Sequence, residues 1–467
     1  MRVFLIIANM RGRYFKPSMP HTGMAYVAAL LLKHGHQIKV LDMRFGYEND
    51  YLLDKLNEFK PDIIGLTGPS LEHSKLYNLI YLLKKNKYCV AVGGPHASTV
   101  RKKLLEETKA DFAIKREGEI TFLELCNGKD KKEIKGLIWR NNGTIVENPD
   151  AEPIADLDSL PYPAYELFEL DKYMDKKIPI LTSRGCPYNC IFCSVRLSMG
   201  NKFRARSPEN VVEELIKWKN KGYDRFIFPD DAFSFDLDRA KKICDLIIEK
   251  NLNIKFDIRN GIRVDCVDEE LLKKMRKAGC FYVSYGIESG VQDVLNKMNK
   301  GITLDQARNA VMLAKKVGLK VGIFFIIGSP GDTFDKFKQS LKFALSLKAD
   351  EIRFYNVIPY PGTRLMEWVT NNARFLKQPD SYLNDSSYWE DEPVFDTVEF
   401  PKEERKKAYN MAESYVMRYL FKTEFGVPIG YIAWLMWNPK TTRKTIMFIG
   451  TRVWYTLRKI KRVLNSS

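Results

Sequence analysis

The stretch Arg184-Gly185-Cys186-Pro187-Tyr188-Asn189-Cys190-Ile191-Phe192-Cys193 places three cysteines within eight positions of a 467-residue chain. It follows an aliphatic run at 178–184 that predicts a strand, so the cysteines are expected in a loop after a strand. Three thiolates at this spacing can hold one face of an iron–sulfur cubane and leave one iron without a protein ligand. That open iron is where a substrate could chelate.

Two other interpretations of the three cysteines are open. Positions i, i+4 and i+7 also describe one stripe of a helix, although Gly185 and Pro187 disfavour a helix that begins before Cys186. A structural zinc site needs a fourth ligand nearby, and all five histidines come earlier in the chain. Three later cysteines fall within helix or strand patterns and are expected in the core: Cys244, Cys266 and Cys280.

Strand and helix patterns alternate on the carboxyl side of the cysteines. Six such units predict an incomplete parallel (β/α)6 barrel of the TIM type, with its active site at the carboxyl ends of the strands. The strands are expected near 178–184, 224–228, 255–259, 281–287, 320–327 and 351–358.

The pattern Cys-x3-Cys-x2-Cys, with the aromatic Phe192 before the last cysteine, resembles the radical S-adenosylmethionine superfamily. The order of the motifs at four later strand ends strengthens the resemblance. These are Phe228-Pro229-Asp230-Asp231, Tyr285-Gly286-Ile287-Glu288-Ser289-Gly290, the run from Gly322 to Gly331, and Pro359-Tyr360-Pro361-Gly362-Thr363.

The resemblance implies a 4Fe-4S cluster on Cys186, Cys190 and Cys193 that cleaves S-adenosylmethionine to a 5'-deoxyadenosyl radical. Such chemistry needs no histidine in the barrel, because the radical removes a hydrogen atom without first ionising the substrate. The resemblance also implies an external electron donor of the flavodoxin or ferredoxin type. The residues that it implies for S-adenosylmethionine are Phe192, Asp230, Asp231, Glu288, Ser289 and Gly328.

Strand and helix patterns also alternate in the first part of the chain, where each strand–helix unit is shorter. Strands near 2–7, 37–41, 62–67, 89–92 and 112–114, with helices between them, predict a doubly wound, Rossmann-like parallel sheet that binds ligands at its carboxyl edge. A hairpin is expected at 136–148, followed by a proline-bearing connector. We expect domains at 1–140 and 178–370, a linker at 141–177, and a helical C-terminal extension at 371–467.

A doubly wound domain joined to a radical barrel resembles the cobalamin-binding radical S-adenosylmethionine family over about residues 1–370. Its local marks are the runs 22–29, 92–98 and 116–119. The Asp-x-His-x-x-Gly loop of other cobalamin proteins is missing from 10–18, so either cobalamin binds without a histidine ligand or the domain only contacts substrate. We favour bound cobalamin. The residues expected to contact it are Gly23, Gly93, Gly94, Pro95 and His96.

The composition indicates a globular, basic protein, and we expect it in the cytoplasm because Met1–Ile7 reads as a buried strand and not as a secretory signal. The formal charge is +17. The sequence contains no run of about 20 apolar residues, the length that a helix needs to span a bilayer. After Phe421 cations alternate with Trp434, Trp437 and Trp454, which suits a segment lying on anionic lipid at the inner face of a membrane. The alternative is a basic helix packed on the barrel. A nucleic-acid partner is not expected, because the tail carries no recognised RNA-binding module.

These observations predict a radical enzyme that modifies an unactivated carbon, most simply by methylation. The alternative is cyclisation or oxidation of a lipid or tetrapyrrole substrate without methyl transfer, as relatives of the anaerobic magnesium-protoporphyrin IX monomethyl ester cyclase type imply. A non-catalytic metal-binding adaptor is disfavoured, because it leaves the four strand-end motifs without a purpose.

Overall fold

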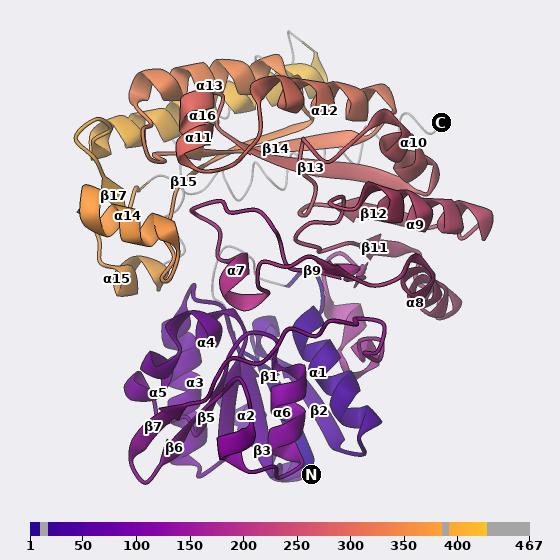
Figure 1. The fold of residues 1–467 in the computed structure, drawn as a ribbon, viewed down its shortest axis with the longest axis vertical. Helices are drawn as coiled ribbons and strands as arrows, with labels where there is room; N and C mark the ends of the chain where they lie inside the picture. Colours follow the sequence, from indigo (N-terminus) through magenta and orange to yellow (C-terminus); the bar gives the residue numbers. More distant parts are fainter. Residues whose placement is uncertain (10–16, 385–391, 427–467) are drawn as a thin grey trace.

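The computed structural model describes residues 1–9, 17–384 and 392–426 (Figure 1). Its first sheet contains five parallel strands in the order β2-β1-β3-β4-β5, so the strand order reverses between β1 and β3. Ligands of such sheets bind outside the carboxyl ends of the strands at this switch point. These strands are β1 (Arg2–Ile7), β2 (Gln37–Asp42), β3 (Ile63–Thr67), β4 (Val90–Gly93) and β5 (Phe112–Ile114).

The predicted hairpin is confirmed as β6 (Leu137–Asn141) and β7 (Thr144–Glu147), which pair in antiparallel fashion. Strand β6 also pairs with β5, so the hairpin extends the first sheet to seven strands. The first sheet therefore continues to Glu147, beyond residue 140.

Helices cover both faces of the first sheet because successive side chains of β1 point to opposite sides. Val3, Leu5 and Ile7 belong to the core shared with α1 (Thr22–Lys33) and α6 (Gly118–Cys126). Phe4 and Ile6 belong to the core on the other face. That face carries α2 (Asn49–Phe59), α3 (His73–Lys85), α4 (Pro95–Val100) and α5 (Lys102–Glu107).

The second sheet is parallel, with six strands in the order β8-β11-β12-β13-β14-β15. Helices such as α12 (Leu304–Lys316) and α13 (Phe334–Ser346) cover the face that lies away from the first sheet (Figure 1). The predicted α/β architecture is therefore confirmed. The strands are β8 (Ile178–Pro179), β11 (Arg225–Ile227), β12 (Lys255–Ile258), β13 (Cys280–Glu288), β14 (Lys320–Ile327) and β15 (Glu351–Asn356).

The first predicted strand of the barrel, 178–184, is broken. After β8 the chain leaves the sheet, and β9 (Ser183–Arg184) pairs antiparallel with β10 (Arg204–Ala205). The buried carboxylate of Asp230 accepts hydrogen bonds from the Thr182 backbone N–H at 2.7 Å and the Ser183 hydroxyl at 2.7 Å. These bonds hold the chain out of the sheet, which the run of residue types alone does not reveal.

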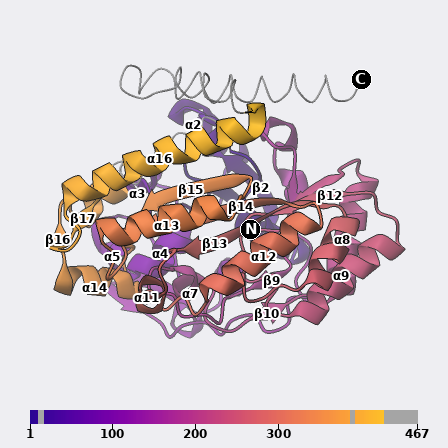
Figure 2. The same cartoon turned by 90° about the horizontal axis from the view of Figure 1, so that it is seen from above.

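The described helices that follow β15 lie along the second sheet and at its carboxyl end. Helix α14 (Arg364–Asn372) and α15 (Pro379–Leu383) lie at the carboxyl end of the barrel, and α16 (Lys402–Phe425) packs beside β15 and α13 (Figures 1 and 2). No helix among the described residues is both long and apolar enough to cross a membrane. The tryptophan-bearing tail from 427 to 467 lies outside the described residues.

Candidate active site between the two sheets

The three cysteines lie on a loop whose two ends are joined by the short β9–β10 ladder, in which Ser183 pairs with Ala205 and Arg184 with Arg204. Gly185 leaves this ladder with φ = +81°, and a Cβ at this position would lie 2.3 Å from the carbonyl oxygen of Lys202. Only glycine suits both this left-handed conformation and this close approach. Gly185 therefore determines how the loop begins.

The cysteine loop is also hydrogen-bonded to the segments that follow β13 and β15. The backbone N–H of Ile191 donates to the Met298 carbonyl at 3.1 Å, and its own carbonyl accepts from the Leu365 N–H at 2.9 Å. The Asn189 carbonyl accepts from the Arg364 guanidinium at 2.8 Å. The loop is thus fixed over the carboxyl edge of the barrel, where parallel barrels place their active sites.

Cys186, Cys190 and Cys193 are half-buried free thiols. They are not one stripe of a helix, because α7 (Val195–Ser198) begins only after Cys193. Burial raises the pKa of Cys193 to about 11 and also raises that of Cys186. Binding a metal centre would therefore release their protons.

Three free thiols on one loop are a donor set that suits an iron–sulfur cluster. Among the described residues, no three His, Cys, Asp or Glu side chains converge closely enough to hold one metal ion. A cubane does not need such convergence, because each cysteine bonds a different iron. The donor set therefore fits a 4Fe-4S cluster and argues against the structural zinc site.

Phe192 and Glu288 are brought together beside the loop by Lys300. The Lys300 ammonium donates to the Glu288 carboxylate at 2.9 Å and lies 5.8 Å from the centre of the Phe192 ring. Glu288 has φ = +73°, and a Cβ on Gly286 would lie 2.4 Å from its Oε1 atom. Gly286 therefore leaves the space into which Glu288 folds. Lys300 was missed from the sequence because it lies twelve residues beyond Glu288 and outside any motif.

Asp230 and Asp231 have different surroundings. Asp230 is fully buried and its carboxylate is occupied by Thr182 and Ser183, so it braces the chain under the loop and does not face an open site. Asp231 accepts from the Gly185 backbone N–H, and burial together with the charge of Asp230 raises its pKa to about 6. Of the two, Asp231 is the one beside the cysteines.

Ser289 and Gly328 each have a partner on a helix that packs on the barrel. The Ser289 hydroxyl is buried against that of Ser340 on α13, at 3.2 Å. Gly328 lies against Arg405 of α16, whose Nη2 donates to the Gly328 carbonyl at 3.1 Å. A Cβ on Gly328 would lie 2.4 Å from that guanidinium. These contacts fix the two strand ends, and the contact of either residue with S-adenosylmethionine stays a prediction.

The glycine loop of the first sheet meets the cysteine loop. Gly93 ends β4, and Gly94, with φ = +93°, precedes Pro95 at the start of α4. Helix α4 packs against α7, which follows Cys193 directly (Figure 1). The carboxyl edge of the first sheet therefore faces the candidate cluster site. Gly23 is exposed at the start of α1, the helix that follows β1.

His96 does not face an open site. Its Nδ1 lies 3.2 Å from the Ser70 hydroxyl and its Nε2 lies 3.1 Å from the Tyr77 hydroxyl, so both ring nitrogens have protein partners. Burial lowers its pKa to about 3 and keeps the ring neutral. His96 stacks on His73 at 5.1 Å between ring centres. We therefore regard His96 as part of a buried polar cluster and not as a cobalamin contact.

This polar cluster continues into the C-terminal extension. The Asn384 amide lies 3.2 Å from His73 Nε2, and its Oδ1 accepts from the Ser74 backbone N–H at 2.7 Å. The carbonyl of Leu383 also accepts from the backbone N–H of Glu72. Helix α15 thus joins the barrel to the β3–α3 connection at the switch point of the first sheet.

Cys266 is a correction to the sequence analysis. It lies in the loop between β12 and α10 (Glu269–Lys277) and is half-exposed, with its Sγ 2.8 Å from the hydroxyl of Tyr188 in the cysteine loop. The Arg263 guanidinium lies 3.5 Å from the Tyr188 ring centre. Cys244 and Cys280 are fully buried, as predicted.

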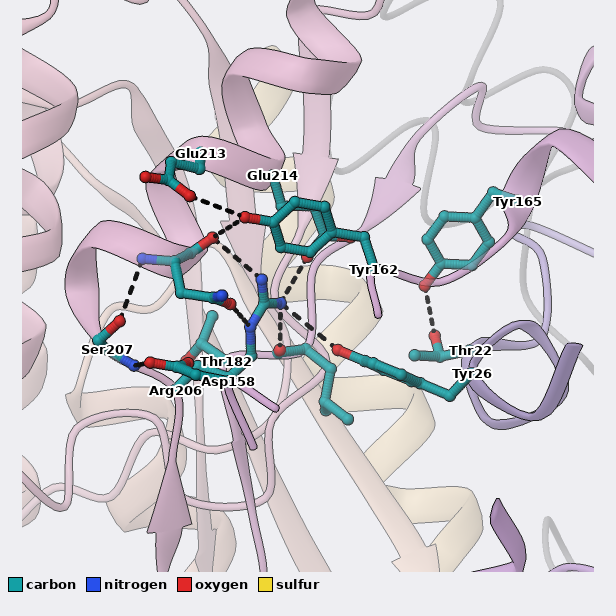
Figure 3. Close-up of polar contacts among 12 residues, drawn as sticks. Thr22, Tyr26, Asp158, Tyr162, Tyr165, Thr182, Arg206, Ser207, Glu213 and Glu214 are labelled. Atoms are coloured by element: carbon teal, nitrogen blue, oxygen red, sulfur yellow. Dashed lines mark hydrogen bonds and ion pairs between the residues drawn. The ribbon is translucent and has the colours of Figure 1, made fainter. Parts of the chain in front are cut away.

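A buried polar network joins the barrel to the first sheet behind the loop (Figure 3). The Arg206 guanidinium forms an ion pair with Glu214 and donates to the Leu181 carbonyl at 3.0 Å and to the Tyr26 hydroxyl of α1 at 3.4 Å. Tyr165 of the connector donates to Thr22 at 3.1 Å. Both sheets are therefore anchored to one polar seam.

Comparison with known families assigns the two sheets separately. Residues 11–126 match the B12 binding domain, and residues 180–344 match the Radical SAM superfamily. The first match covers most of the seven-stranded sheet, and the second contains the cysteine loop.

Similar proteins share both parts. An uncharacterized methyltransferase of Pyrococcus horikoshii is 33% identical over 86% of this chain and 88% of its own length. The anaerobic magnesium-protoporphyrin IX monomethyl ester cyclase of Rubrivivax gelatinosus is 29% identical over 79% of this chain and 70% of its own. The fold matches a radical S-adenosylmethionine methyltransferase from Kitasatospora setae, solved with cobalamin and a [4Fe-4S] cluster, with a TM-score of 0.69, 19% identity and coverage of 87% and 84%.

Proposed function

Because the chain belongs to the cobalamin-binding radical S-adenosylmethionine family, we propose that it methylates an unactivated carbon of a small-molecule or lipid substrate. The observation that carries this proposal is the packing of α7 against α4. It brings the cysteine loop of the barrel to the carboxyl edge of the B12-binding sheet. Two cofactors that act on one substrate carbon need such an arrangement.

The residues of the site divide into three groups. Cys186, Cys190 and Cys193 would hold the cluster, whereas Phe192, Asp231 and Glu288 would line the place of S-adenosylmethionine. Gly23, Gly93, Gly94 and Pro95 would border cobalamin. When bound, these groups supply radical formation and methyl transfer, while the chain orients them and excludes water.

The reaction is tested with anaerobically purified enzyme after cluster reconstitution, supplied with cobalamin and a flavodoxin-type reductant. We expect 5'-deoxyadenosine and S-adenosylhomocysteine to form together, and the product of an accepted substrate to gain the mass of one methylene group. If 5'-deoxyadenosine forms but the product of the substrate does not gain that mass, methylation is contradicted.

A second candidate function is radical cyclisation or oxidation without methyl transfer. It is favoured by the similarity to the magnesium-protoporphyrin ester cyclase over 79% of this chain. In that case 5'-deoxyadenosine would accumulate without S-adenosylhomocysteine, and the product would lose hydrogen and gain no carbon.

We predict that cobalamin binds with no protein imidazole on cobalt. Both ring nitrogens of His73 and His96 are within hydrogen-bond distance of protein groups, and His21 Nδ1 caps α1 by accepting from the Met24 N–H at 3.2 Å. Electron paramagnetic resonance of the cob(II)alamin form should therefore lack histidine nitrogen splitting. A splitting that disappears in His21→Ala would identify His21 as the ligand and refute the prediction.

We further predict that the tail after Gly426 brings the enzyme to anionic lipid, where an apolar substrate would reside. Each Lys or Arg near such a surface contributes about 1 kcal/mol, and this attraction is screened by salt. Truncation after Gly426 keeps the buried Phe421 of α16. Full-length protein should float with anionic liposomes and the truncated protein should not. Equal flotation of the two would show that the tail is not a membrane anchor.

A further inference from the structure

Two arginines face each other across the ladder that closes the cysteine loop, and both bind glutamates of the first sheet's α6 segment. We propose that Glu117 and Glu119 are positioning residues for the cluster loop, which reaches its cluster-binding form only when the B12-binding sheet is docked. This inference rests on the proposed role of Cys186, Cys190 and Cys193 as cluster ligands.

The contacts involve both ends of the loop. At its start, Arg184 Nη2 lies 2.8 Å from Glu119 Oε1, and its guanidinium lies 4.8 Å from the Tyr26 ring centre. At its end, Arg204 donates from Nη2 to Glu117 Oε1 at 2.5 Å and from Nη1 to Glu117 Oε2 at 3.0 Å. Arg184 Nη1 also lies 3.8 Å from Glu117 Oε1, so both ends of the loop contact carboxylates at the start of α6.

The seam is closed to water around these charges. The side chains of Arg184 and Glu119 are 4% and 6% exposed, and those of Arg204 and Glu117 are 9% and 5% exposed. A buried ion pair that loses one partner leaves an uncompensated charge, which is far more costly than the loss of a surface pair. These contacts can therefore control a loop, whereas exposed pairs of the same geometry could not.

The ladder itself is too short to hold the loop against its own charges. It contains only two residue pairs, and one of them places Arg184 directly opposite Arg204. Like charges opposite each other on neighbouring strands destabilise the pairing. The two carboxylates neutralise this repulsion from outside the barrel. Without them, the loop ends that carry Gly185 and Lys202 would separate.

Glu117 accepts one further hydrogen bond, from the connector. Its Oε2 also accepts the backbone N–H of Ile154 at 2.9 Å, so it joins the connector to the same point. Arg204 Nη1 donates to the Ile154 carbonyl at 2.7 Å. The connector, the first sheet and the loop therefore meet at one carboxylate.

The test uses full-length protein carrying Glu117→Gln, Glu119→Gln or both. In cluster-free protein, hydrogen exchange of the amides at 185–203 should accelerate roughly tenfold or more in the double variant, because buried arginine charge is left unpaired. After reconstitution, iron content per chain and the electron paramagnetic resonance signal of the reduced cluster should fall by a similar factor. The matched control is Glu124→Gln on the same helix, whose partner Lys129 is in the same domain.

A charge-balanced variant separates positioning from a general loss of folding. Adding Arg184→Gln to Glu119→Gln removes the unpaired charge and the repulsion across the ladder, so loop protection should return toward the parent value. If the single and double glutamine variants keep both parental exchange rates and parental iron content, the proposal is overturned. It is equally overturned if exchange accelerates as much in distant strands of the barrel as in the loop.

The two measurements, hydrogen exchange in cluster-free protein and iron content after reconstitution, also test this inference separately from the proposed function. Exchange in the cluster-free protein reports on the loop alone. If parental protein takes up no cluster on these cysteines, the function assigned to them fails, while the exchange measurement still decides whether the glutamates hold the loop.

Discussion

Replacement of Cys186, Cys190 or Cys193 by Ala is expected to abolish 5'-deoxyadenosine formation. Each thiolate would bond a different iron, so the loss of one removes one of the three protein ligands of the cluster. The measurement is 5'-deoxyadenosine released per reconstituted enzyme, together with iron content per chain.

The matched controls are Cys244→Ala and Cys280→Ala, whose thiols are fully buried in the barrel core. They should cost some stability but leave the cluster and 5'-deoxyadenosine formation in place. Cys266→Ala is a stricter control, because its Sγ lies against Tyr188 of the cysteine loop. If any of the three loop variants still cleaves S-adenosylmethionine, the assignment of these cysteines as cluster ligands is refuted.

Arg206→Met is expected to lower the free energy of unfolding by about 3 to 5 kcal/mol, the cost of leaving a buried charge unpaired. Glu214, its partner, is fully buried, and the guanidinium also links α1 to the barrel through Tyr26 (Figure 3). Urea unfolding followed by tryptophan fluorescence measures the change. Arg225→Met, at an exposed position on β11, is the control and should change stability little.

The double variant Arg206→Met with Glu214→Met should recover part of the lost stability, because the unpaired carboxyl group is removed as well.

The loss of stability in the single variant Arg206→Met should depend on pH. Burial raises the pKa of Glu214, and losing Arg206 raises it further. A folded-state pKa above the unfolded value of about 4.3 means that the native state binds the extra proton, so stability is lost as pH rises. A deficit that grows toward low pH would contradict this account.

Local patterns predicted most of the fold. The run Arg2–Ile7 and the later barrel strands have the composition and spacing of buried parallel strands, and the structure contains them. The hairpin around Asn141 and Gly143 was predicted from turn chemistry alone. The break between β8 and β9 was not, because it depends on the Asp230 carboxylate, 48 residues from Thr182.

The candidate site was predictable only where neighbouring residues define it. The cysteine spacing and the positions of Phe192 and Glu288 follow from short motifs. Lys300 pairs with Glu288 through the geometry of the strand end, and Asp230 turns its carboxylate under the loop. Adjacent in sequence, Asp230 and Asp231 have different partners in the fold: Thr182 and Ser183 for Asp230, and the Gly185 backbone N–H for Asp231.

The interdomain contacts could not be predicted from either domain's own pattern. Glu117 and Arg204 are 87 residues apart, and each alone has the appearance of an ordinary surface charge. Their burial arises because the two sheets meet at this seam, where one hydrophobic core includes side chains from both. Within the first domain, the surroundings of His96 also depend on residues distant in sequence, because Ser70 and Tyr77 enclose its ring.

The junction between α15 and the first sheet sets an order of events during synthesis. Ser74 and Asn384 are 310 positions apart, so the ribosome has made the whole first sheet and all six barrel strands before this hydrogen bond can form. Until then, the β3–α3 connection lacks the hydrogen bonds that Leu383 and Asn384 later make to Glu72 and Ser74.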